Sequence, residues 1–443
     1  MDDSTLRRAL WICDYFPRPH DLTSGTWALE NAVALQAAGL PAVVLAPTPW
    51  IPRVLAVTDE LKRWSEVPAE HVIRGVPVYY PRCPHYPRRW VHNGIYSRLP
   101  WLDSGFLWPW CRKTVDRMMQ KHPFDVAHAN FMFPAGYIGL MLKRVYGTPL
   151  VVHERSVQRL GQASAFAARG SLYRRILRDA DLVLTENSRM AAELRRLEPA
   201  ARDVRVLVQP GTNPALAEGQ GQLRPEKYAG KLVVLSVGAL SRRKGHDVLI
   251  RAIAKLRADF PELRCRIIGG GPEQHPLESL VRQLGLSDVV KLCGKRPHAE
   301  VLGNMSWCDV FALASWGEAS GTVYGEAMQF GKPVIACADE GISEVLRDKD
   351  HGRLVPAQDV GALAEGLRWL LEDAGRRTRI GEQARALANR ELSYPRAAQT
   401  LIGAYRGLAQ PAKGGSPPRS KHTRETPAAD TGTVRYYATG RDT

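Results

Sequence analysis

The stretch that decides the fold class spans residues 232–256 and reads LVVLSVGALSRRKGHDVLIRAIAKL. Its first six residues are almost entirely aliphatic, which predicts a strand buried on both faces. The second half of the stretch predicts an amphipathic helix, whose apolar stripe contains Val248, Leu249, Ala252, Ile253 and Leu256. A glycine-containing turn joins the two. A buried strand followed by an amphipathic helix is the repeating element of an α/β protein.

Apolar runs of the same kind recur on both sides of this stretch. The N-terminal series lies at residues 9–13, 42–46, 76–80, 125–129, 150–153, 182–185 and 204–208. The C-terminal series lies at residues 232–237, 265–268, 289–292, 310–313, 333–337 and 352–355. Helix-length amphipathic segments separate the runs, so we expect an α/β protein with two doubly wound parallel sheets.

Changes in composition divide the chain. Residues 216–230 are rich in Gly, Gln and Ala and have no apolar periodicity, which predicts a linker. We assign residues 1–215 to an N-terminal domain and residues 231–391 to a C-terminal domain. Residues 411–443 are dominated by Gly, Pro, Ser, Thr and charged side chains, which predicts a disordered basic tail.

Composition excludes several classes of protein. A chain of 443 residues with 44% hydrophobic and 24% charged residues is typical of a globular protein of two or three domains, and not of a fibrous, low-complexity or polytopic membrane protein. The 61 basic residues exceed the 45 acidic residues by 16. This excess favours anionic partners such as phosphates, nucleic acid or an acidic membrane surface.

The cysteine pattern and the N-terminus indicate a cytoplasmic location. The seven cysteines are scattered and never form a Cys-x-x-Cys pair, so neither a disulfide framework nor a zinc site is indicated. Residues 1–8 are charged and a strand-like run follows directly, which predicts no signal peptide. Residues 131–142 are apolar but too few to span a membrane, and we interpret them as a buried helix.

The strongest chemical signal is the segment of residues 314–328, ASWGEASGTVYGEAM. Ser320, Gly321 and Thr322 come just before or at a predicted helix start, where backbone N–H groups can bind an anion. Glu318 and Glu326 can face one crevice and accept hydrogen bonds from the hydroxyls of two sugars. The alternative is two surface glutamates at a helix start, where the helix dipole favours acidic side chains.

A second signal is the run Arg242, Arg243, Lys244 and Gly245 between a strand and a helix. Positive charge and a helix start suit a diphosphate, although the spacing is not that of a P-loop and a solvated basic turn is the alternative. A third segment, IGGGP at residues 268–272, lacks the Gly-x-Gly-x-x-Gly pattern. It predicts a tight turn and no nicotinamide cofactor.

In this order and spacing, the three segments resemble the retaining glycosyltransferases of family four, which have the GT-B fold of two Rossmann-like domains facing a cleft. The resemblance covers about residues 10–408. Supporting stretches are FDVAH at 124–128, PLVVH at 149–153, RDADLVL at 178–184, GKPVI at 331–335, EGISE at 340–344 and GRLVP at 352–356. The resemblance also implies that residues 392–410 form a helix that crosses back to the N-terminal domain.

The resemblance implies a transferase that uses a nucleotide-diphosphate sugar, UDP- or GDP-linked, as substrate and needs no further cofactor. Its C-terminal domain holds most of the donor. Glu326 is then expected to bind the ribose hydroxyls and Glu318 a hydroxyl of the transferred sugar. Lys244, together with Arg243, is expected to bind the diphosphate.

Two N-terminal residues match the family pattern as well. Gly25 corresponds to the glycine loop that approaches the donor phosphates, and His153 to the histidine set against the sugar near the scissile bond. The sequence differs from the pattern at Ala239, where an arginine is usual, and at Ser320, where an aromatic residue is usual. We expect Arg243 to substitute for the missing arginine.

No metal site is expected. Lys244, an arginine and helix-end amides can stabilise the negative charge of the leaving diphosphate. The Asp-x-Asp matches at residues 179–181 and 348–350 lack further oxygen ligands nearby in the sequence, as a hard cation would need. His128, at the end of a predicted buried strand, is interpreted as a hydrogen-bonded core residue.

Residues 86–113 contain four tryptophans and five basic residues against one aspartate. This mixture suits a lipid headgroup interface or stacking on a sugar, and a Trp-rich loop packed under its own domain is the alternative. We expect a glycan or lipid-linked acceptor and a peripheral contact with the inner membrane face. Competing functions are a GT-B relative that binds nucleotide sugars without transfer, a 2-epimerase and, ranked lower, a basic nucleic-acid-binding protein.

Overall fold

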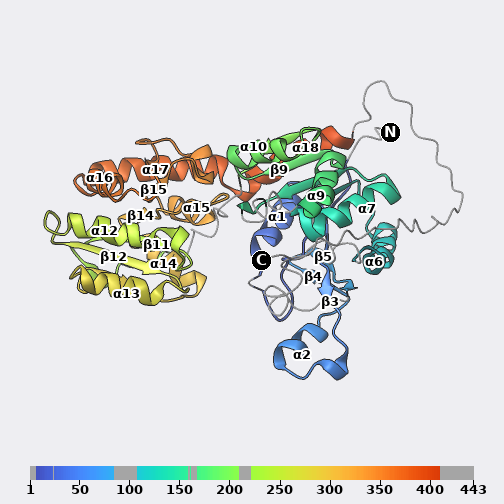
Figure 1. The fold of residues 1–443 in the computed structure, drawn as a ribbon, viewed down its shortest axis with the longest axis horizontal. Helices are drawn as coiled ribbons and strands as arrows, with labels where there is room; N and C mark the ends of the chain where they lie inside the picture. The colour runs from blue at the N-terminus through green and yellow to red at the C-terminus, as the bar shows by residue number, and fades with distance from the viewer. Residues whose placement is uncertain are drawn as a thin grey trace, which may run out of the picture. The chain divides into compact units, whose positions relative to one another are not determined.

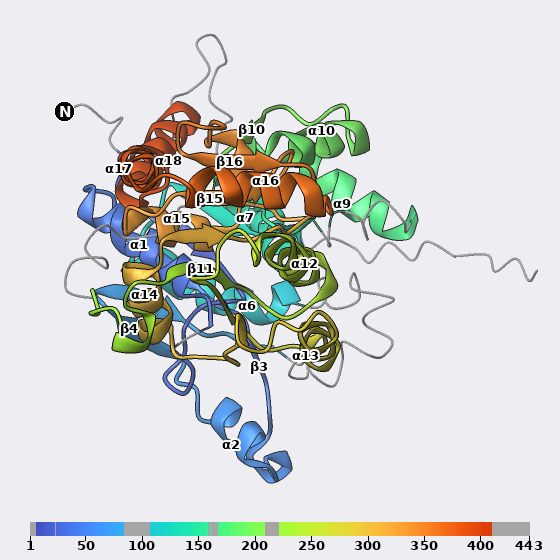
Figure 2. The same cartoon turned by 90° about the vertical axis from the view of Figure 1, so that its left-hand side faces the viewer.

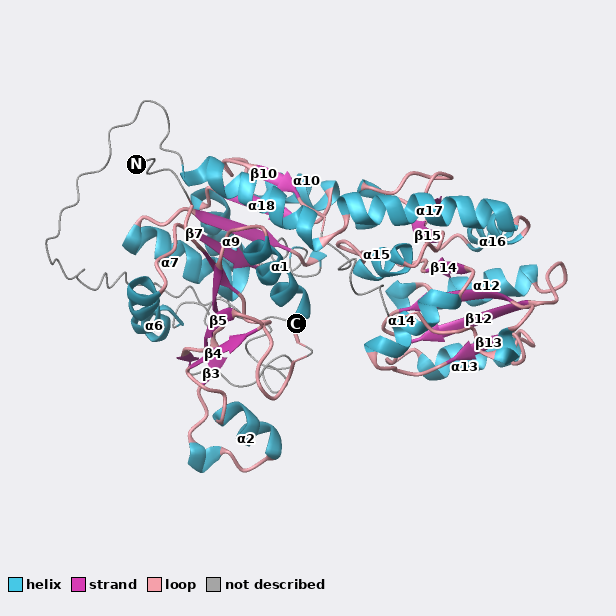
Figure 3. Cartoon of the chain, turned by 180° about the vertical axis from the view of Figure 1, so that it is seen from behind, coloured by secondary structure: helices cyan, strands magenta, loops and turns pink. Residues whose placement is uncertain are grey.

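A computed structural model describes residues 6–22, 24–83, 107–157, 160, 167–208 and 221–409 of the chain. Its strands form an eight-stranded sheet, a six-stranded sheet and a small two-stranded sheet. Figure 3 shows the strands of both large sheets with helices beside them. The predicted tail at 411–443 lies outside the described residues. The predicted linker lies partly outside them, so the domain boundaries stay predictions.

The N-terminal sheet has the strand order β10-β9-β8-β7-β1-β2-β5-β4. Its strands are β1 (Ala9–Ile12), β2 (Ala42–Leu45), β4 (Glu70–Ile73), β5 (Val76–Tyr79), β7 (Val126–Asn130), β8 (Leu150–Glu154), β9 (Leu182–Thr185) and β10 (Val204–Val206). All seven N-terminal apolar runs overlap a strand, and these strands pair in parallel as predicted. A separate pair is formed by β3 (Thr48–Pro49) and β6 (Arg82–Cys83).

The antiparallel strand β4 is a departure from the expected all-parallel sheet. It pairs with β5 through a two-residue hairpin at Arg74 and Gly75, whose φ angles of 49° and 79° are those of a type I′ turn. Three of the four β4 residues are exposed. An exposed edge strand has no continuous apolar run, so the pattern that finds buried strands misses it.

Helices cover both faces of the N-terminal sheet. One face packs against α6 (Leu107–Lys121), α7 (Tyr137–Tyr146), α9 (Ala167–Asp179) and α10 (Ser188–Leu197). The other face packs against α1 (Thr26–Ala37) and α18 (Tyr394–Ala409). The short helix α2 (Asp59–Ser65) precedes β4. The expected helix at 131–142 begins only at Tyr137, because a π-turn containing Pro134 precedes it and proline lacks the N–H that a helix interior needs.

The last helix crosses back to the N-terminal sheet, as the resemblance implied. Figure 1 draws α18 in red among the blue and green N-terminal elements. The hydroxyl of Tyr405 on α18 lies 2.6 Å from Nδ1 of His128, whose ring is fully buried and stacks on Trp11. His128 is therefore a hydrogen-bonded core residue that ties α18 to the sheet. No helix in the described part of the chain has the length and apolarity to cross a membrane.

The C-terminal sheet is entirely parallel, with the order β13-β12-β11-β14-β15-β16. Its strands are β11 (Leu232–Val237), β12 (Leu263–Ile268), β13 (Val290–Leu292), β14 (Val310–Ala312), β15 (Val334–Cys337) and β16 (Gly352–Val355). Its helices are α12 (His246–Leu256), α13 (Gln274–Gln283), α14 (His298–Trp307), α15 (Thr322–Gln329), α16 (Val360–Leu371) and α17 (Ala374–Glu391). The opening stretch of the sequence therefore forms β11 and α12, as predicted.

Each face of this sheet has its own apolar core. Val234 of β11 packs with α12, α13 and α16, whereas Val233 and Leu235 pack with α14, α15 and α17. Figure 2 shows the strands between these two groups of helices. Side chains alternate between the two faces of a strand, so both faces must be apolar to pack against both layers.

The topology determines where loops can form a site. The chain leaves β11 toward β12 on one side and later returns to β14 on the other, and in the N-terminal sheet β2 and β7 likewise lie on opposite sides of β1. Ligand crevices in open α/β sheets form outside the carboxyl ends of the strands at such switch points. The loops after β1, β7, β11 and β14 are therefore the structural candidates.

Candidate functional site

The loop after β11 carries the three basic residues identified in the sequence. Arg242–Lys244 form a 3-10 turn, and Gly245 follows with a φ of 64°. A Cβ at Gly245 would lie 2.1 Å from the Ala314 carbonyl oxygen, so glycine is needed for this loop to approach the loop after β14. The Trp316 N–H donates to the Arg243 carbonyl at 2.9 Å. The basic loop and the glutamate loop are therefore packed together.

Lys244 and Arg243 converge on Glu318. The distances from Lys244 Nζ and Arg243 Nη1 to Oε1 of Glu318 are 2.6 Å and 2.9 Å. The side chains of Lys244 and Glu318 are only 14% and 12% exposed. Two cations on one carboxylate leave a net positive charge, so this cluster can attract an anion.

Glu340 enters the sequence analysis only within the stretch EGISE and without a role, yet its carboxylate holds the same loop. Its Oε1 accepts a hydrogen bond from the Gly317 N–H at 2.8 Å, and its Oε2 accepts one from the Glu318 N–H at 2.7 Å. Glu340 is buried. Because hydrogen bonds from amides to a carboxylate are charge-assisted, Glu340 fixes the backbone from which Glu318 projects.

Helix α15 begins at Thr322, as predicted, and Gly321 precedes it with a φ of 70°. Further along this helix, Glu326 Oε1 accepts a hydrogen bond from Nε2 of His298 at 2.9 Å. This hydrogen bond raises the pKa of His298. The start of α15 thus presents a helix N-terminus and a carboxylate with a histidine partner.

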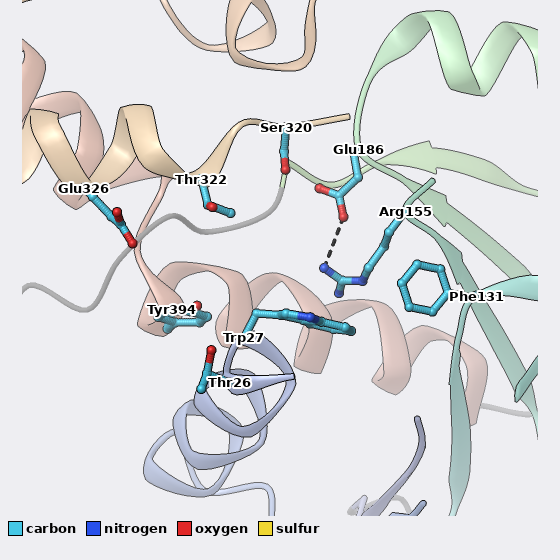
Figure 4. Close-up of a pocket in the computed structure, with 9 residues that line it drawn as sticks. All are labelled: Thr26, Trp27, Phe131, Arg155, Glu186, Ser320, Thr322, Glu326 and Tyr394. Atoms are coloured by element: carbon cyan, nitrogen blue, oxygen red, sulfur yellow. Dashed lines mark hydrogen bonds and ion pairs between the residues drawn. The ribbon is translucent and has the colours of Figure 1, made fainter. Parts of the chain in front are cut away.

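A cavity of about 320 Å³ brings the two sheets' loops together. Its lining residues, drawn in Figure 4, are Thr26, Trp27, Phe131, Arg155, Glu186, Ser320, Thr322, Glu326 and Tyr394. The predicted site residues Ser320, Thr322 and Glu326 belong to this set. Glu318, whose carboxylate contacts Lys244 and Arg243, does not occur among the described lining residues, and neither do those two cations.

Gly25 lies beside this cavity, directly before Thr26 and Trp27. It caps α1 with a φ of 72°, and a Cβ there would lie 1.9 Å from the Tyr15 carbonyl oxygen. Only glycine combines that backbone conformation with so close an approach. The loop after β1 therefore delivers the first turn of α1 to the cavity.

His153 lies at the end of β8 but does not occur among the described cavity-lining residues. Its side chain is 1% exposed, and its Nδ1 accepts a hydrogen bond from Arg155 Nη2 at 3.0 Å. Burial and the nearby Arg155 hold the pKa of His153 well below its ordinary value. The neutral imidazole therefore lies behind Arg155, which does line the cavity.

Arg155 and Glu186 are functional candidates that the sequence analysis does not include. Arg155 directly follows β8 and Glu186 directly follows β9, and these strands pair in parallel. Arg155 Nη1 donates to Glu186 Oε1 at 3.1 Å, the contact dashed in Figure 4. Each is the first charged residue after a buried strand, and this position in the sequence could have identified both as candidates.

No group of three or more His, Cys, Asp or Glu suited to a metal occurs within the described ranges. Asp181 accepts hydrogen bonds from Lys143 Nζ and the Leu150 N–H at 2.6 and 2.9 Å. Asp348 accepts hydrogen bonds from Arg353 Nε and the Leu354 N–H, both at 2.9 Å. These contacts give the two Asp-x-Asp segments structural roles.

The Trp- and Arg-rich segment at 86–113 is described only in its last part. Residues 84–106 lie outside the described residues. Within α6, Trp108 is buried, whereas Trp110 is 48% exposed.

Two family models match the chain. The model described as glycosyl transferases group 1 matches residues 223–387, and the model described as glycosyl transferase 4-like domain matches residues 23–210. The D-inositol 3-phosphate glycosyltransferase of Corynebacterium aurimucosum is 30% identical over 302 residues, which cover 64% of this chain and 71% of that relative.

Solved structures share the fold across the chain. Sucrose-phosphate synthase from Thermosynechococcus elongatus superposes with a TM-score of 0.68 at 22% identity, covering 91% of this chain and 99% of its own. Anabaena HepE in complex with UDP superposes with a TM-score of 0.65 at 21% identity, and the match covers 90% of this chain and 100% of the HepE chain.

Together, the fold and the matches define a glycosyltransferase with the GT-B fold. The resemblance found in the sequence is thereby confirmed. The chain belongs to the glycosyl transferases group 1 family, within the glycosyltransferases of family four.

Proposed function

We propose that this glycosyltransferase moves a sugar from a UDP- or GDP-linked donor to a glycan or lipid-linked acceptor with retention of configuration. The observation that carries the proposal is the convergence of Lys244 and Arg243 on Glu318, next to the first turn of α15. Positive charge beside a helix N-terminus suits a diphosphate. HepE was solved with UDP and with UDP-glucose, which supports a donor of this class.

The proposed reaction breaks the bond between the sugar C1 and the diphosphate oxygen. The acceptor oxygen bonds to C1, and its proton passes to the departing phosphate on the same face of the sugar. Configuration is then retained without a protein nucleophile. Lys244, Arg243 and the N–H groups around Gly321 stabilise the charge that develops on the diphosphate.

The donor-binding roles follow the same proposal. Glu326 accepts hydrogen bonds from the ribose hydroxyls. When the diphosphate binds Lys244 and Arg243, the Glu318 carboxylate is released from them and accepts a hydrogen bond from the transferred sugar. The loop of Gly25 approaches the phosphates from the N-terminal sheet. Ser320 and Thr322 contribute from the cavity wall, where both are placed.

The proposed chemistry needs no metal, since Lys244 and Arg243 supply two positive charges at the leaving group. We expect EDTA to leave turnover unchanged. A loss of turnover with EDTA that Mg²⁺ or Mn²⁺ restores would contradict this part of the proposal.

A panel of UDP-, GDP- and ADP-sugars tests the proposal directly. Release of nucleoside diphosphate and the anomeric configuration of the product are followed by NMR. Transfer with the donor's configuration is expected. Release of a C2-epimerised free sugar would indicate a 2-epimerase, and binding without release would indicate a nucleotide-sugar-binding protein.

We further propose a cytoplasmic protein that contacts the inner membrane face through residues 86–113 and has no specific nucleic acid partner. Supporting features are the exposed Trp110 and seven free, buried cysteines, which suit a reducing compartment. Co-sedimentation with phosphatidylglycerol-containing vesicles is expected, and no binding to neutral or anionic vesicles would contradict the membrane contact.

A further inference from the structure

Arg155 is the one positively charged side chain among the described residues that line the cavity. It lies at the carboxyl end of β8, across the cavity from Ser320 and Thr322 in Figure 4. The carboxylates of Glu186 and Glu326 line the same cavity. The N-terminal wall therefore carries an arginine and a glutamate in contact, in a cavity whose described lining has more negative than positive charge.

Three contacts fix the Arg155 guanidinium. Nη1 donates to Glu186 at 3.1 Å, Nη2 donates to His153 at 3.0 Å, and Cζ lies 4.4 Å from the centre of the Trp27 ring. The backbone N–H of Arg155 also donates to Oε1 of Glu154 at 3.0 Å. Its Nε has no hydrogen-bond partner among the described residues. Nε is buried, but Nη1 and Nη2 each carry a second N–H, so the guanidinium is held in place with donors left for a ligand.

The hydrogen bond to Arg155 determines the state of His153. An arginine can only donate, so Nδ1 of His153 must accept and the proton of the neutral ring lies on Nε2. This nitrogen lies 3.3 Å from Glu186 Oε1 without hydrogen-bond geometry. His153 therefore has no basic nitrogen directed into the cavity. It is a positioning residue that acts through Arg155.

We propose that Arg155 and Glu186 form a subsite for an uncharged, polyhydroxylated end of the acceptor, that is, an unphosphorylated sugar. A sugar hydroxyl both donates and accepts, so a paired guanidinium and carboxylate can bind adjacent hydroxyls. A phosphate or carboxylate group placed against Arg155 would also lie beside Glu186, and like charges in contact are unfavourable. Glu186 would thus select against anionic acceptors.

This inference rests on the proposed transfer, and paired sugars test it separately. The full chain is given its preferred donor with glucose or glucose 6-phosphate, and with myo-inositol or inositol 3-phosphate. The neutral member of each pair is expected to give the higher kcat/KM. Glu186→Gln is expected to reduce that preference about tenfold or more.

Two variants control for folding and for charge. Glu186→Asp keeps the carboxylate and is expected to keep the preference for neutral sugars. Glu193→Gln, on α10, removes a half-buried carboxylate that pairs with Arg196 at 2.6 Å and should behave as wild type. Saturation-transfer NMR on the same sugars measures binding without turnover, so the subsite is tested even where no donor is cleaved.

Several results would overturn the inference. They are a preference for the phosphorylated sugars, no binding of any sugar in the panel, or the same preference in wild type and Glu186→Gln. If Glu186→Gln changes the KM for the donor and leaves the preference among acceptors as it is in the wild type, Arg155 and Glu186 bind the donor and not the acceptor. Failure of the proposed function is recognised separately, because no donor would then release nucleoside diphosphate.

Discussion

Glu340 holds the backbone of Glu318, since its Oε2 accepts the Glu318 N–H at 2.7 Å while its Oε1 accepts the Gly317 N–H. Arg189 at the start of α10 donates to the same carboxylate at 3.3 Å. The neighbouring Asn187 side chain donates to the Ala319 carbonyl at 2.8 Å. One buried carboxylate therefore connects the glutamate loop to a helix of the N-terminal sheet.

Glu340→Gln is expected to destabilise the protein and to slow turnover. The amide keeps one acceptor oxygen but turns an NH₂ group toward a backbone N–H, so one buried donor loses its partner at a cost of about 1–3 kcal/mol. We expect a lower free energy of unfolding in urea and a lower kcat. Glu365→Gln, on the exposed face of α16, is the control. Unchanged stability and turnover in Glu340→Gln would remove its positioning role.

Lys244→Ala is expected to lower kcat by about a hundredfold, because one preorganised charge at the leaving group is lost. Steady-state kinetics with the preferred donor measure the effect. Lys255→Ala, an exposed lysine of α12, controls for the change in net charge. Full turnover in Lys244→Ala would show that the diphosphate binds elsewhere.

Glu326→Gln is expected to lower the pKa of His298 and to weaken donor binding. The hydrogen bond to Glu326 raises the His298 pKa, so in the wild type His298 stays protonated at a higher pH than an ordinary histidine and loses this pairing as the pH rises through its pKa. NMR titration of the His298 ring and calorimetry with the donor measure the two effects. Glu278→Gln, on α13, should leave the His298 titration unchanged.

Gly25→Ala is expected to destabilise the protein more than Gly39→Ala. Both glycines have a positive φ, of 72° and 89°, which costs an alanine about 1–2 kcal/mol. A Cβ at Gly39 meets nothing within 4 Å, whereas one at Gly25 lies 1.9 Å from the Tyr15 carbonyl oxygen. Urea unfolding of the two variants measures the difference. An equal decrease in the free energy of unfolding in the two variants would show that the loop after β1 can move to accommodate the added Cβ.

Local patterns predict most of the fold. The buried strands are continuous apolar runs, because a strand covered by helices on both faces needs apolar side chains at successive positions. Strands β11 and β16 match their predicted ranges residue for residue. Strand β4 is not predicted, because most of its residues are exposed and do not form an apolar run. Gly245 and Gly321 mark loop ends in the sequence, but only the approach of Ala314 and the Tyr324 ring explains why each must be glycine.

The amino-acid sequence by itself determined the α/β class, the family and the identity of the basic and glutamate loops, because strand burial and loop composition are local properties of the chain. Only the tertiary structure decided that His153 lies behind Arg155, that Glu186 pairs with Arg155, and that Glu340 holds Glu318. The Arg155–Glu186 and Glu318–Glu340 contacts join residues that follow different strands or lie in different loops. Their distances depend on how parallel strands are ordered and packed, and no spacing along the chain encodes that order.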